Sequence, residues 1–403
     1  MSANTRVLGL MSGTSVDAID AAVIDIGPAG LETGTLTVVD HREVPWDDAL
    51  RRRILACLPP ARIDVGEVCA LEQAIGQAFA AVAREVQAEV DGIELVACHG
   101  QTVFHWVADS GPDRGRALGT LQWGEPAWIA EATGLPVVSN LRAADIAAGG
   151  QGAPLVPVLD VMLCGDRPTA VINLGGIANV TVVRDGRAVV AGDTGPANCL
   201  IDALVQRATG QPFDADGALA AAGRVDEALL ARLLDHPYLG LPMPKSTGRE
   251  VFSLAWFDQV VAEVHPDERT RPGLPDLLAT GVAFTCRTLL DQLPDDLERL
   301  VVSGGGAHHP GIMARLRDHA DWQVVSPDER GVPADAKEAV LIALLGWLSV
   351  TGRPGVATDA TGRPLTGARE ARVLGTVTLS ARRGGGPSSP DGSSGRRGPA
   401  LPG

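Results

Sequence analysis

The chain contains very little lysine. Lys245 and Lys337 are the only two among 403 residues, so almost all of the 34 basic side chains are arginines. Neither lysine follows a glycine-rich loop. This excludes a Walker-type P-loop, because that motif ends in a lysine that reaches the nucleotide phosphates.

Membrane spans, paired cysteine motifs and excess positive charge are also lacking. No apolar run is long enough to cross a bilayer, and the six cysteines show no Cys-x-x-Cys spacing. The first residues lead directly into an apolar stretch, so no signal peptide is expected. We therefore predict reduced thiols in a cytoplasmic protein. The net charge of −15 disfavours nucleic acid and anionic membranes as partners.

The N-terminal stretch has the pattern of two strands joined by a small-residue turn. Arg6–Met11 and Ala21–Ile26 are apolar, and the residues between them include Gly13 and two aspartates, Asp17 and Asp20. Such a turn can present backbone N–H groups to phosphate oxygens, and a neighbouring carboxylate can hold a divalent cation. An ordinary hairpin without a ligand explains the same residues, because short Gly/Ser/Thr motifs are weak signals.

The same pattern returns in the second half of the chain. Residues 169–183 again read as strand, glycine turn and strand, and residues 187–191 supply a third strand, as residues 36–41 do in the first half. The two copies begin about 160 residues apart, which is the size of one domain. The repeat predicts two duplicated α/β domains that face each other across a cleft, with chance similarity as the alternative.

Four glycine-containing turns are predicted to follow apolar strands. They are residues 12–15, 175–176, 192–196 and 303–307. Spread over both halves, they suggest a nucleotide bound between the domains. Asp193 lies within the third turn, where a carboxylate is well presented as a general base. Capping of the helix expected after Pro196 is the structural alternative for Asp193.

Nine stretches of the chain, taken together, resemble the anhydro-N-acetylmuramic acid kinase family. The resemblance runs from about residue 6 to residue 380 in the order of the family. The stretches are 9–20 (GLMSGTSVDAID), 98–105 (CHGQTVFH), 141–157 (LRAADIAAGGQGAPLVP), 173–181 (NLGGIANVT), 192–198 (GDTGPAN), 244–250 (PKSTGRE), 303–307 (SGGGA), 335–339 (DAKEA) and 365–368 (LTGA).

The resemblance implies a fold and an activity. The family belongs to the sugar kinase, actin and Hsp70 superfamily, so the fold class expected is α/β, with two duplicated actin-like (ribonuclease H-like) domains facing a nucleotide-binding cleft. The expected division is residues 1–165, residues 166–381 and a disordered tail, 382–403. The implied reaction uses ATP and Mg²⁺ to open the 1,6-anhydro ring of anhydro-N-acetylmuramic acid with water and to phosphorylate O6, in cell-wall recycling. A homodimer is implied.

Site residues are carried over by position. Asp193 matches the catalytic base, while His99, Arg142 and Glu338 match residues expected at the sugar. Asp17 and Asp20 are the expected metal ligands. The residues expected at the nucleotide are Gly13, Thr14, Ser15, Val16, Asp17, Ala18, Ile19, Asp20, Gly175, Gly176, Gly304, Gly305 and Gly306.

Some positions depart from the family pattern or allow a simpler role. Ala197 stands where glycine is usual, which is harmless only if its φ is negative. His309 stands where asparagine is common. Glu338, at the start of a predicted helix, could merely favour the helix dipole. His99 could be a strand-end histidine bonded to backbone.

Three functions remain open at this point. The first is the anhydro-sugar kinase, and the second is a related kinase acting on an unbridged sugar. The third is a nucleotide-gated binding protein in the manner of Hsp70 or actin. Residues 140–154 are expected to form a long ordered loop. The part from Arg142 to Pro154 resembles this one family and not general sugar kinases, so it favours the first over the second. The third would need a peptide-binding module, and none is expected after the second domain.

Overall fold

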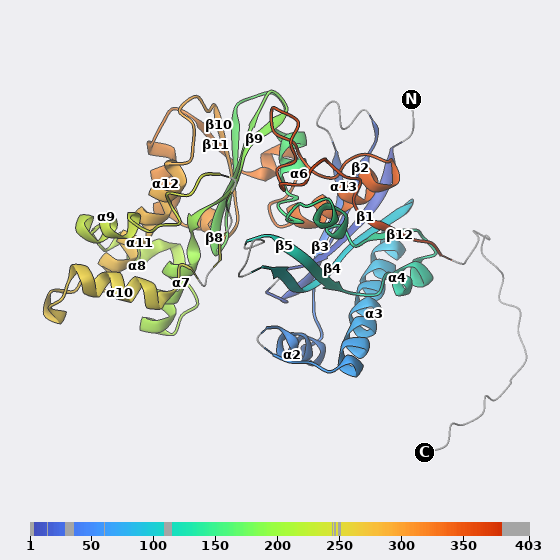
Figure 1. The fold of residues 1–403 in the computed structure, drawn as a ribbon, viewed down its shortest axis with the longest axis horizontal. Helices are drawn as coiled ribbons and strands as arrows, with labels where there is room; N and C mark the ends of the chain where they lie inside the picture. The colour runs from blue at the N-terminus through green and yellow to red at the C-terminus, as the bar shows by residue number, and fades with distance from the viewer. Residues whose placement is uncertain are drawn as a thin grey trace, which may run out of the picture.

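The computed structural model describes residues 4–13, 15–28, 36–59, 61–108, 115–243, 245, 247–248 and 251–380. Thr14 and the predicted tail, 382–403, lie outside the described residues. The strands form two sheets, and each sheet is the centre of one lobe (Figure 1).

The first sheet has seven strands in the order β12-β6-β4-β1-β2-β3, with β5 paired to β4. The apolar side chains predicted for its opening strands, such as Val7, Leu8 and Leu10, are fully buried. The strands are β1 (Thr5–Ser12), β2 (Ala18–Ile26), β3 (Thr37–Pro45), β4 (Leu95–Val107), β5 (Ala117–Trp123), β6 (Val137–Ser139) and β12 (Thr376–Thr378).

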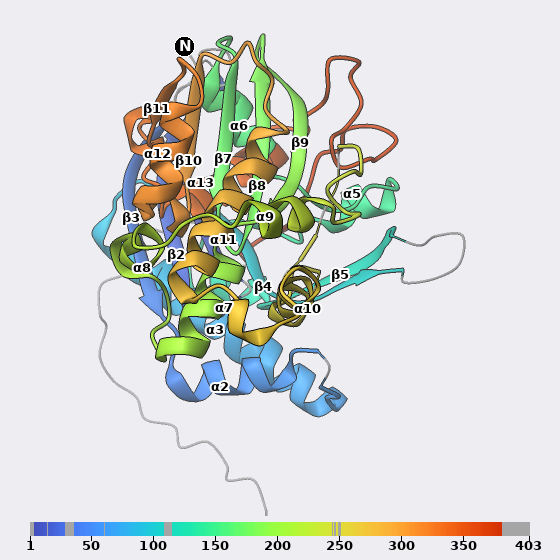
Figure 2. The ribbon, with the colours of Figure 1, turned by 90° about the vertical axis from the view of Figure 1, so that its left-hand side faces the viewer.

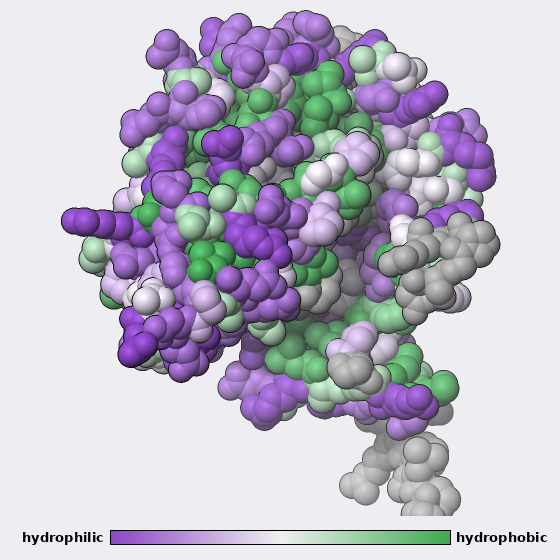
Figure 3. Space-filling view, turned by 60° about the vertical axis from the view of Figure 1, so that its left-hand side comes forward, coloured by the Kyte–Doolittle hydropathy of each residue, from purple (hydrophilic) through white to green (hydrophobic). Residues whose placement is uncertain are grey.

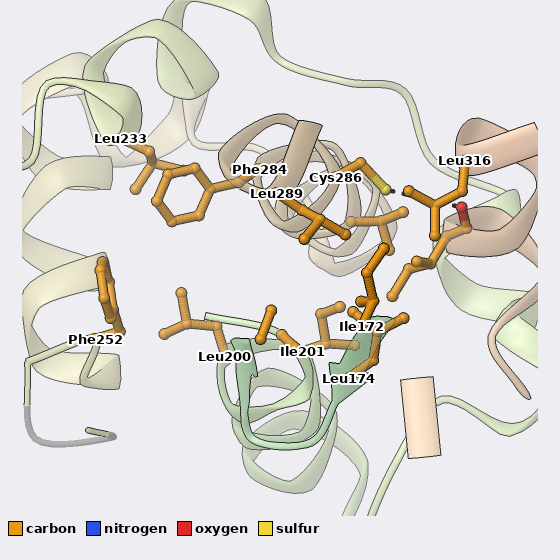
Figure 4. Packing of buried hydrophobic residues seen from close by; sticks show 14 of the residues in the cluster. Ile172, Leu174, Leu200, Ile201, Leu233, Phe252, Phe284, Cys286, Leu289 and Leu316 are labelled. Atoms are coloured by element: carbon orange, nitrogen blue, oxygen red, sulfur yellow. Dashed lines mark hydrogen bonds between the residues drawn. The ribbon is translucent and has the colours of Figure 1, made fainter. Parts of the chain in front are cut away.

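The second sheet has five strands in the order β11-β10-β7-β8-β9. Its hydrophobic core continues into the helices that cover one face, where Phe252, Phe284 and Leu289 converge on Leu200 (Figure 4). The strands are β7 (Thr169–Leu174), β8 (Ile177–Arg184), β9 (Arg187–Pro196), β10 (Arg299–Ser303) and β11 (Gln323–Val325).

The two sheets repeat one strand order. In each lobe three antiparallel strands, β3-β2-β1 or β9-β8-β7, are followed by a parallel strand, β4 or β10, and then by a second one, β6 or β11. This confirms the predicted fold of two duplicated α/β domains. The internal repeat in the sequence is therefore a repeat of structure and not chance similarity.

The helices follow the predicted apolar periodicity. In α3 the buried residues Leu71, Ile75, Phe79 and Val82 share one face, and Asp64 caps the first turn by accepting from the backbone N–H of Glu67. The helices are α2 (Asp48–Cys57), α3 (Val65–Glu89), α4 (Pro126–Thr133), α5 (Ala143–Ala147), α6 (Pro157–Cys164), α7 (Asn198–Thr209), α8 (Ala218–Ala221), α9 (Glu227–Leu234), α10 (Leu254–Val264), α11 (Leu274–Leu290), α12 (Pro310–Asp318) and α13 (Lys337–Val350), with 3₁₀ turns η1 (Ala215–Gly217), η2 (Glu268–Thr270), η3 (Gly305–His308) and η4 (Pro327–Arg330).

Helix α13 returns from the second half of the chain to the first sheet. It packs on β1 so closely that a Cβ on Gly9 would lie 2.1 Å from the carbonyl oxygen of Ala339. Strand β12 then pairs with β6. The predicted domain of residues 166–381 thus contributes one helix and one strand to the sheet of the first lobe, and α13 begins where the two lobes meet (Figure 1).

Three details of the secondary structure differ from the prediction. Strand β9 runs through Pro196, so residues 192–196 are strand and not a turn. The stretch 140–154, predicted as a loop, contains the short helix α5. Strand β5 was not predicted; it forms with β4 the antiparallel ribbon that projects from the first lobe (Figure 2).

The surface is mainly hydrophilic on the face drawn in Figure 3, where apolar residues gather in the lower part. Within the described residues, no helix combines the length and the apolar character that crossing a membrane requires. All six cysteines are free thiols, as predicted; Cys98, Cys164 and Cys286 are buried, whereas Cys69 is exposed.

Candidate active site

A cavity of about 640 Å³ lies between the lobes. We call it the interlobe cavity. Asp20 and Glu43 line it from the first sheet, and Asn173 and Asn179 line it from the second. The loop after β10 and the start of α13 close it; they contribute Ser303, Gly304, Gly305, Ala307, His308, Asp335, Lys337 and Glu338. Residues from four predicted motifs therefore meet at one place.

The first-lobe wall of the cavity carries two facing carboxylates. Asp20 on β2 is the direct cross-strand partner of Glu43 on β3. Partial burial, together with the nearby charges of Glu43, Glu338 and Asp335, raises the pKa of Asp20 to about 7. Like charges directly opposite on a sheet are destabilising, so this wall favours a bound cation or a bound proton.

Replacing Asp20 by asparagine should stabilise the metal-free protein at high pH. The folded pKa of about 7 lies above the ordinary value of 3.8, so the folded state holds a proton that the unfolded chain releases. Wild-type stability must then fall as the pH rises from about 4 to about 7 and level off above that. The melting temperature of Asp20→Asn relative to wild type should increase over this range.

The matched control is Asp17→Asn, in the same motif. Its carboxylate is exposed and paired with Arg51, so this substitution should give no gain that grows with pH. Calorimetry at pH 5 and pH 8 without divalent cations makes the comparison. An Asp20→Asn difference that stays constant between these pH values would contradict the assigned pKa.

The start of α13 brings two charged side chains to the cavity. The Glu338 side chain is exposed, and it lines the cavity. The surrounding protein removes part of its hydration and raises its pKa, whereas the positive charges of Arg142 and Lys337 act to lower it. Lys337 Nζ lies 2.8 Å from Oδ1 of Asp160 on α6, whose side chain is buried. Helix α6 packs on both α13 and the second sheet, so this ion pair anchors α13 at the junction of the lobes.

His99 and Arg142 contact each other in the first lobe. The Arg142 Nε–H donates to Nε2 of His99 at 2.9 Å, and Arg142 Nη1 donates to the carbonyl oxygen of Gly152 at 2.7 Å. His99 is buried on β4, and burial with the positive charge of Arg142 lowers its pKa to about 3. His99 is therefore a neutral hydrogen-bond acceptor toward Arg142 across the physiological pH range.

The turn between β1 and β2 is held by side chains from elsewhere. Gln101 Nε2 on β4 donates to the carbonyl oxygen of Gly13 at 3.1 Å. Arg51 on α2 donates to the carbonyl oxygen of Val16 and to Asp17. Val16 is buried with a φ of 55°, a strained conformation for a β-branched residue. Among the described residues of the 13–20 motif, Asp20 is the one that lines the cavity.

The matching turn of the second lobe, Gly175 and Gly176, accepts hydrogen bonds from the N-terminus of α7. Their carbonyl oxygens accept from the backbone N–H groups of Ala197, Asn198 and Cys199 at the start of α7. Ala197 has a φ of −111°. Because this φ is negative, alanine causes no backbone strain where the family usually has glycine. The neighbouring Asn173 and Asn179 carry side chains into the cavity lining instead.

The loop after β10 approaches β7 at van der Waals distance. Gly304 has a φ of 82°, and a Cβ there would lie 2.6 Å from Oδ1 of Asn173. A Cβ on Gly306 would lie 2.7 Å from the Cβ of Leu174. Glycine is thus needed for the loop to close the cavity. The predicted nucleotide residues Gly304 and Gly305 line it.

Asp193 lies on β9, directly opposite Asn179 of β8. Its carboxylate Oδ2 accepts from the backbone N–H of Thr247 at 2.8 Å, and its own N–H donates to the carbonyl of Lys245. The Tyr238 hydroxyl donates to its backbone oxygen, and burial beside Asp193 raises the pKa of that hydroxyl. Asp193 does not cap α7, whose N-cap is Ala197. It adjoins the interlobe cavity through Asn179 without being part of its lining.

Lys245 holds the loop that covers Asp193. Its buried ammonium donates to the carbonyl oxygens of Tyr238 and Leu239, and burial lowers its pKa. Gly192 leaves room for this loop, because a Cβ there would lie 2.8 Å from the Lys245 carbonyl oxygen. Lys245 therefore stabilises the backbone of this loop. Lys337 is the lysine that lines the interlobe cavity, and Lys245 is not part of its lining.

Sequence reasoning assigned no role to Glu43 or Asp160, and none to Gln101 beyond its motif. The register of β2 with β3 is needed to show that Glu43 lies opposite Asp20. The return of α13 to the first lobe is needed to show that Asp160 pairs with Lys337. Gln101 is two residues from His99 on one strand. The pairing of β4 with β1 shifts register between Cys98 and Gln101, and Gly100 has a φ of 76°. The regular alternation of a strand is interrupted there, so the spacing in the sequence could not have linked the two side chains.

Comparisons with known proteins agree on one family. A sequence model of the family described as anhydro-N-acetylmuramic acid kinase matches residues 5–380. The curated protein of that name from Streptomyces coelicolor is 48% identical over 381 residues, 93% of each chain. The one from Rhodococcus erythropolis is 48% identical over 392 residues, 94% of this chain and 95% of the relative.

Solved structures give weaker likenesses. A ROK family glucokinase from Streptomyces griseus in complex with glucose and AMPPNP has a TM-score of 0.34 and 16% identity, and covers 85% of this chain and 99% of that chain. An activator of 2-hydroxyisocaproyl-CoA dehydratase from Clostridium difficile with bound ADPNP has a TM-score of 0.39 and 11% identity, over 86% and 96% of the two chains. The fold assignment rests on the strand order above and not on these likenesses.

Proposed function

Because the chain belongs to the anhydro-N-acetylmuramic acid kinase family, we propose that it uses ATP to phosphorylate O6 of 1,6-anhydro-N-acetylmuramic acid while water opens the anhydro ring. The products are N-acetylmuramic acid 6-phosphate and ADP. The observation that carries this proposal is the interlobe cavity, where Asp20, Gly304, Gly305 and Glu338, from motifs far apart in the sequence, line one space.

Asp193 is the proposed general base. The backbone N–H of Thr247 donates to its Oδ2 and so orients the carboxylate, which would take a proton from water. That water attacks C1, the C1–O6 bond breaks, and O6 attacks the γ-phosphorus as the bond to the β-phosphate oxygen breaks. Asp193 is carried by the second lobe and Arg142 and Glu338 by elements packed on the first, so the sugar lies between lobes in this arrangement. Closure would exclude bulk water from the γ-phosphate.

The nucleotide would lie against the Ser303–Ala307 loop, with its phosphates toward the β1–β2 turn. Two basic side chains, Arg317 and Lys337, line the cavity, and Lys337 is paired with Asp160. Arg142 is outside this lining. Backbone N–H groups, these arginines and a divalent cation would have to offset the phosphate charge.

Of the two aspartates expected as Mg²⁺ ligands, Asp20 is the one placed to hold the ion in the cavity. Asp20 faces the cavity with Glu43 beside it, whereas Asp17 is exposed and paired with Arg51. Among the described residues no group of three or more acidic, histidine or cysteine side chains is arranged to hold a metal. One or two carboxylates plus phosphate oxygens are the usual Mg²⁺ set in such enzymes. When bound, Mg²⁺ would neutralise charge on the phosphates.

The test is ADP release with purified anhydro-N-acetylmuramic acid, followed by mass analysis of the product. A product that gains both water and phosphate supports the proposal. A product that gains phosphate alone would support a kinase that leaves the ring closed, and release of ADP with unbridged N-acetylmuramic acid only would move the substrate to an ordinary sugar. N-acetylmuramic acid 6-phosphate, the proposed product, suits a role in cell-wall recycling in the cytoplasm. The expected homodimer is tested separately, by measuring the size of the protein in solution.

A further inference from the structure

His99 has no ring nitrogen available for a ligand. Its side chain is 3% exposed. The ring Nδ1 lies 3.0 Å from the carbonyl oxygen of Gly100, which can only accept, so Nδ1 carries the proton. Nε2 is then the acceptor, and the Arg142 Nε–H occupies it at 2.9 Å. A direct bond from His99 to the sugar, the role expected from the resemblance, would require one of these bonds to break.

We propose that His99 is a positioning residue, which fixes the guanidinium of Arg142 toward the sugar without neutralising it. The inference rests on the proposed function, in which Arg142 contacts the acceptor.

Arg142 is clamped on one side and open on the other. A guanidinium has five N–H donors; one goes to His99 and one to the Gly152 carbonyl. No hydrogen bond from its Nη2 to another part of the described chain is found. Gly152 is itself fixed, because its N–H donates to the buried carboxylate of Asp145, which also accepts from the Thr366 hydroxyl. The clamp is therefore rigid, and the remaining donors are free for a ligand.

A neutral imidazole suits this task better than a carboxylate. An aspartate at this position would form an ion pair with Arg142 and compete with any polar or anionic group of the acceptor. Neutral Nε2 satisfies one donor of a half-buried guanidinium and leaves its charge intact. The lowered pKa of His99 agrees with this state, and Glu338 is the acidic group that acts electrostatically on Arg142 from α13.

The experiment is a double-mutant cycle read through the Michaelis constants for sugar and for ATP. Arg142→Ala should raise the KM for the sugar. His99→Leu, which fills the space but accepts no hydrogen bond, should raise it about 10- to 100-fold, the usual value of a hydrogen bond to a charged group. The KM for ATP should change less than threefold. In the Arg142→Ala background, His99→Leu should add almost nothing.

Rescue and control variants separate positioning from packing. His99→Gln keeps an acceptor and should recover most of the sugar affinity. His105→Gln changes a second histidine of the same strand. Its hydrogen-bond partner among the described residues is Thr120, and the variant should leave both constants near wild type. Should His99→Leu fail to fold, His99→Phe removes the acceptor within a ring of similar size.

Two outcomes separate the inference from the proposed function. If Arg142→Ala leaves the sugar KM unchanged, the sugar role of Arg142 fails and the proposed function must be revised. If Arg142→Ala raises it but His99→Leu does not, or if the two effects multiply in the double mutant, the positioning role of His99 is overturned.

Discussion

Asp193→Asn should abolish turnover and leave ATP affinity within about twofold of wild type. General-base assistance contributes about 10² to 10⁴ in rate, so the residual activity should lie below about 1% of wild type. An asparagine oxygen can still accept from the Thr247 N–H, and the backbone bonds of Asp193 to Lys245 and Tyr238 do not involve the side chain. The substitution therefore removes basicity while each of these hydrogen bonds can still form.

The measurement is steady-state ADP release together with ATP binding by calorimetry. Asp185→Asn is the matched control, because Asp185 is exposed in the β8–β9 turn at a φ of 49°, a conformation that asparagine also adopts readily. It should retain full activity. Wild-type turnover in Asp193→Asn would refute the assignment of Asp193 as the base, whereas equal loss of ATP binding and turnover would indicate a structural role.

The three-stranded start of each sheet, and the meeting of several candidate site residues at one cavity, could be predicted from the sequence. Apolar strands alternate with glycine turns in both halves of the sequence. The structure has three antiparallel strands at each of these places, β1-β2-β3 and β7-β8-β9. Asp20 and Gly304 lie in motifs that end or begin such strands, so their arrival at one cavity follows from the duplication. Asp193 is expected on a turn after a strand, and the structure has it within strand β9 instead.

The choice between Asp17 and Asp20 could not be made from the sequence. Both lie in one motif with equal chemistry, and only their placement separates them. Asp20 lies on β2 opposite Glu43, while Asp17 precedes β2 and meets Arg51 of α2. That helix lies more than thirty residues further along the chain, so no local pattern reports the contact.

Long-range packing also decides the environment of Glu338. The sequence places Glu338 at a helix start, and a role in the helix dipole would be sufficient there. The structure adds that α13 crosses back to the first sheet, where Gly9 permits contact with Ala339. This contact brings Glu338 to the junction of the lobes, within electrostatic reach of Arg142. Its exposure to the cavity is a tertiary property that helix propensity does not encode.

Gly304→Ala should weaken ATP binding by at least tenfold. The residue has a φ of 82° and a ψ of 169°, a region that is open almost only to glycine and costs other residues about 1–3 kcal/mol. The added Cβ would also lie 2.8 Å from the backbone of Leu174, which belongs to a central strand and cannot shift cheaply. The loop must therefore move away from β7, and the cavity opens on the side of the proposed adenosine site.

Gly210→Ala separates backbone strain from this clash. Gly210 has a φ of 76° at the end of α7, and no atom lies within 4 Å of a Cβ there. That variant should lose about 1–2 kcal/mol of stability and keep its ATP affinity. Calorimetric titration with ATP, on samples whose melting temperature shows that they are folded, compares the two. Unchanged ATP affinity in Gly304→Ala would mean that the Ser303–Ala307 loop does not hold the nucleotide, because no placement of an alanine at this φ leaves the loop against Asn173.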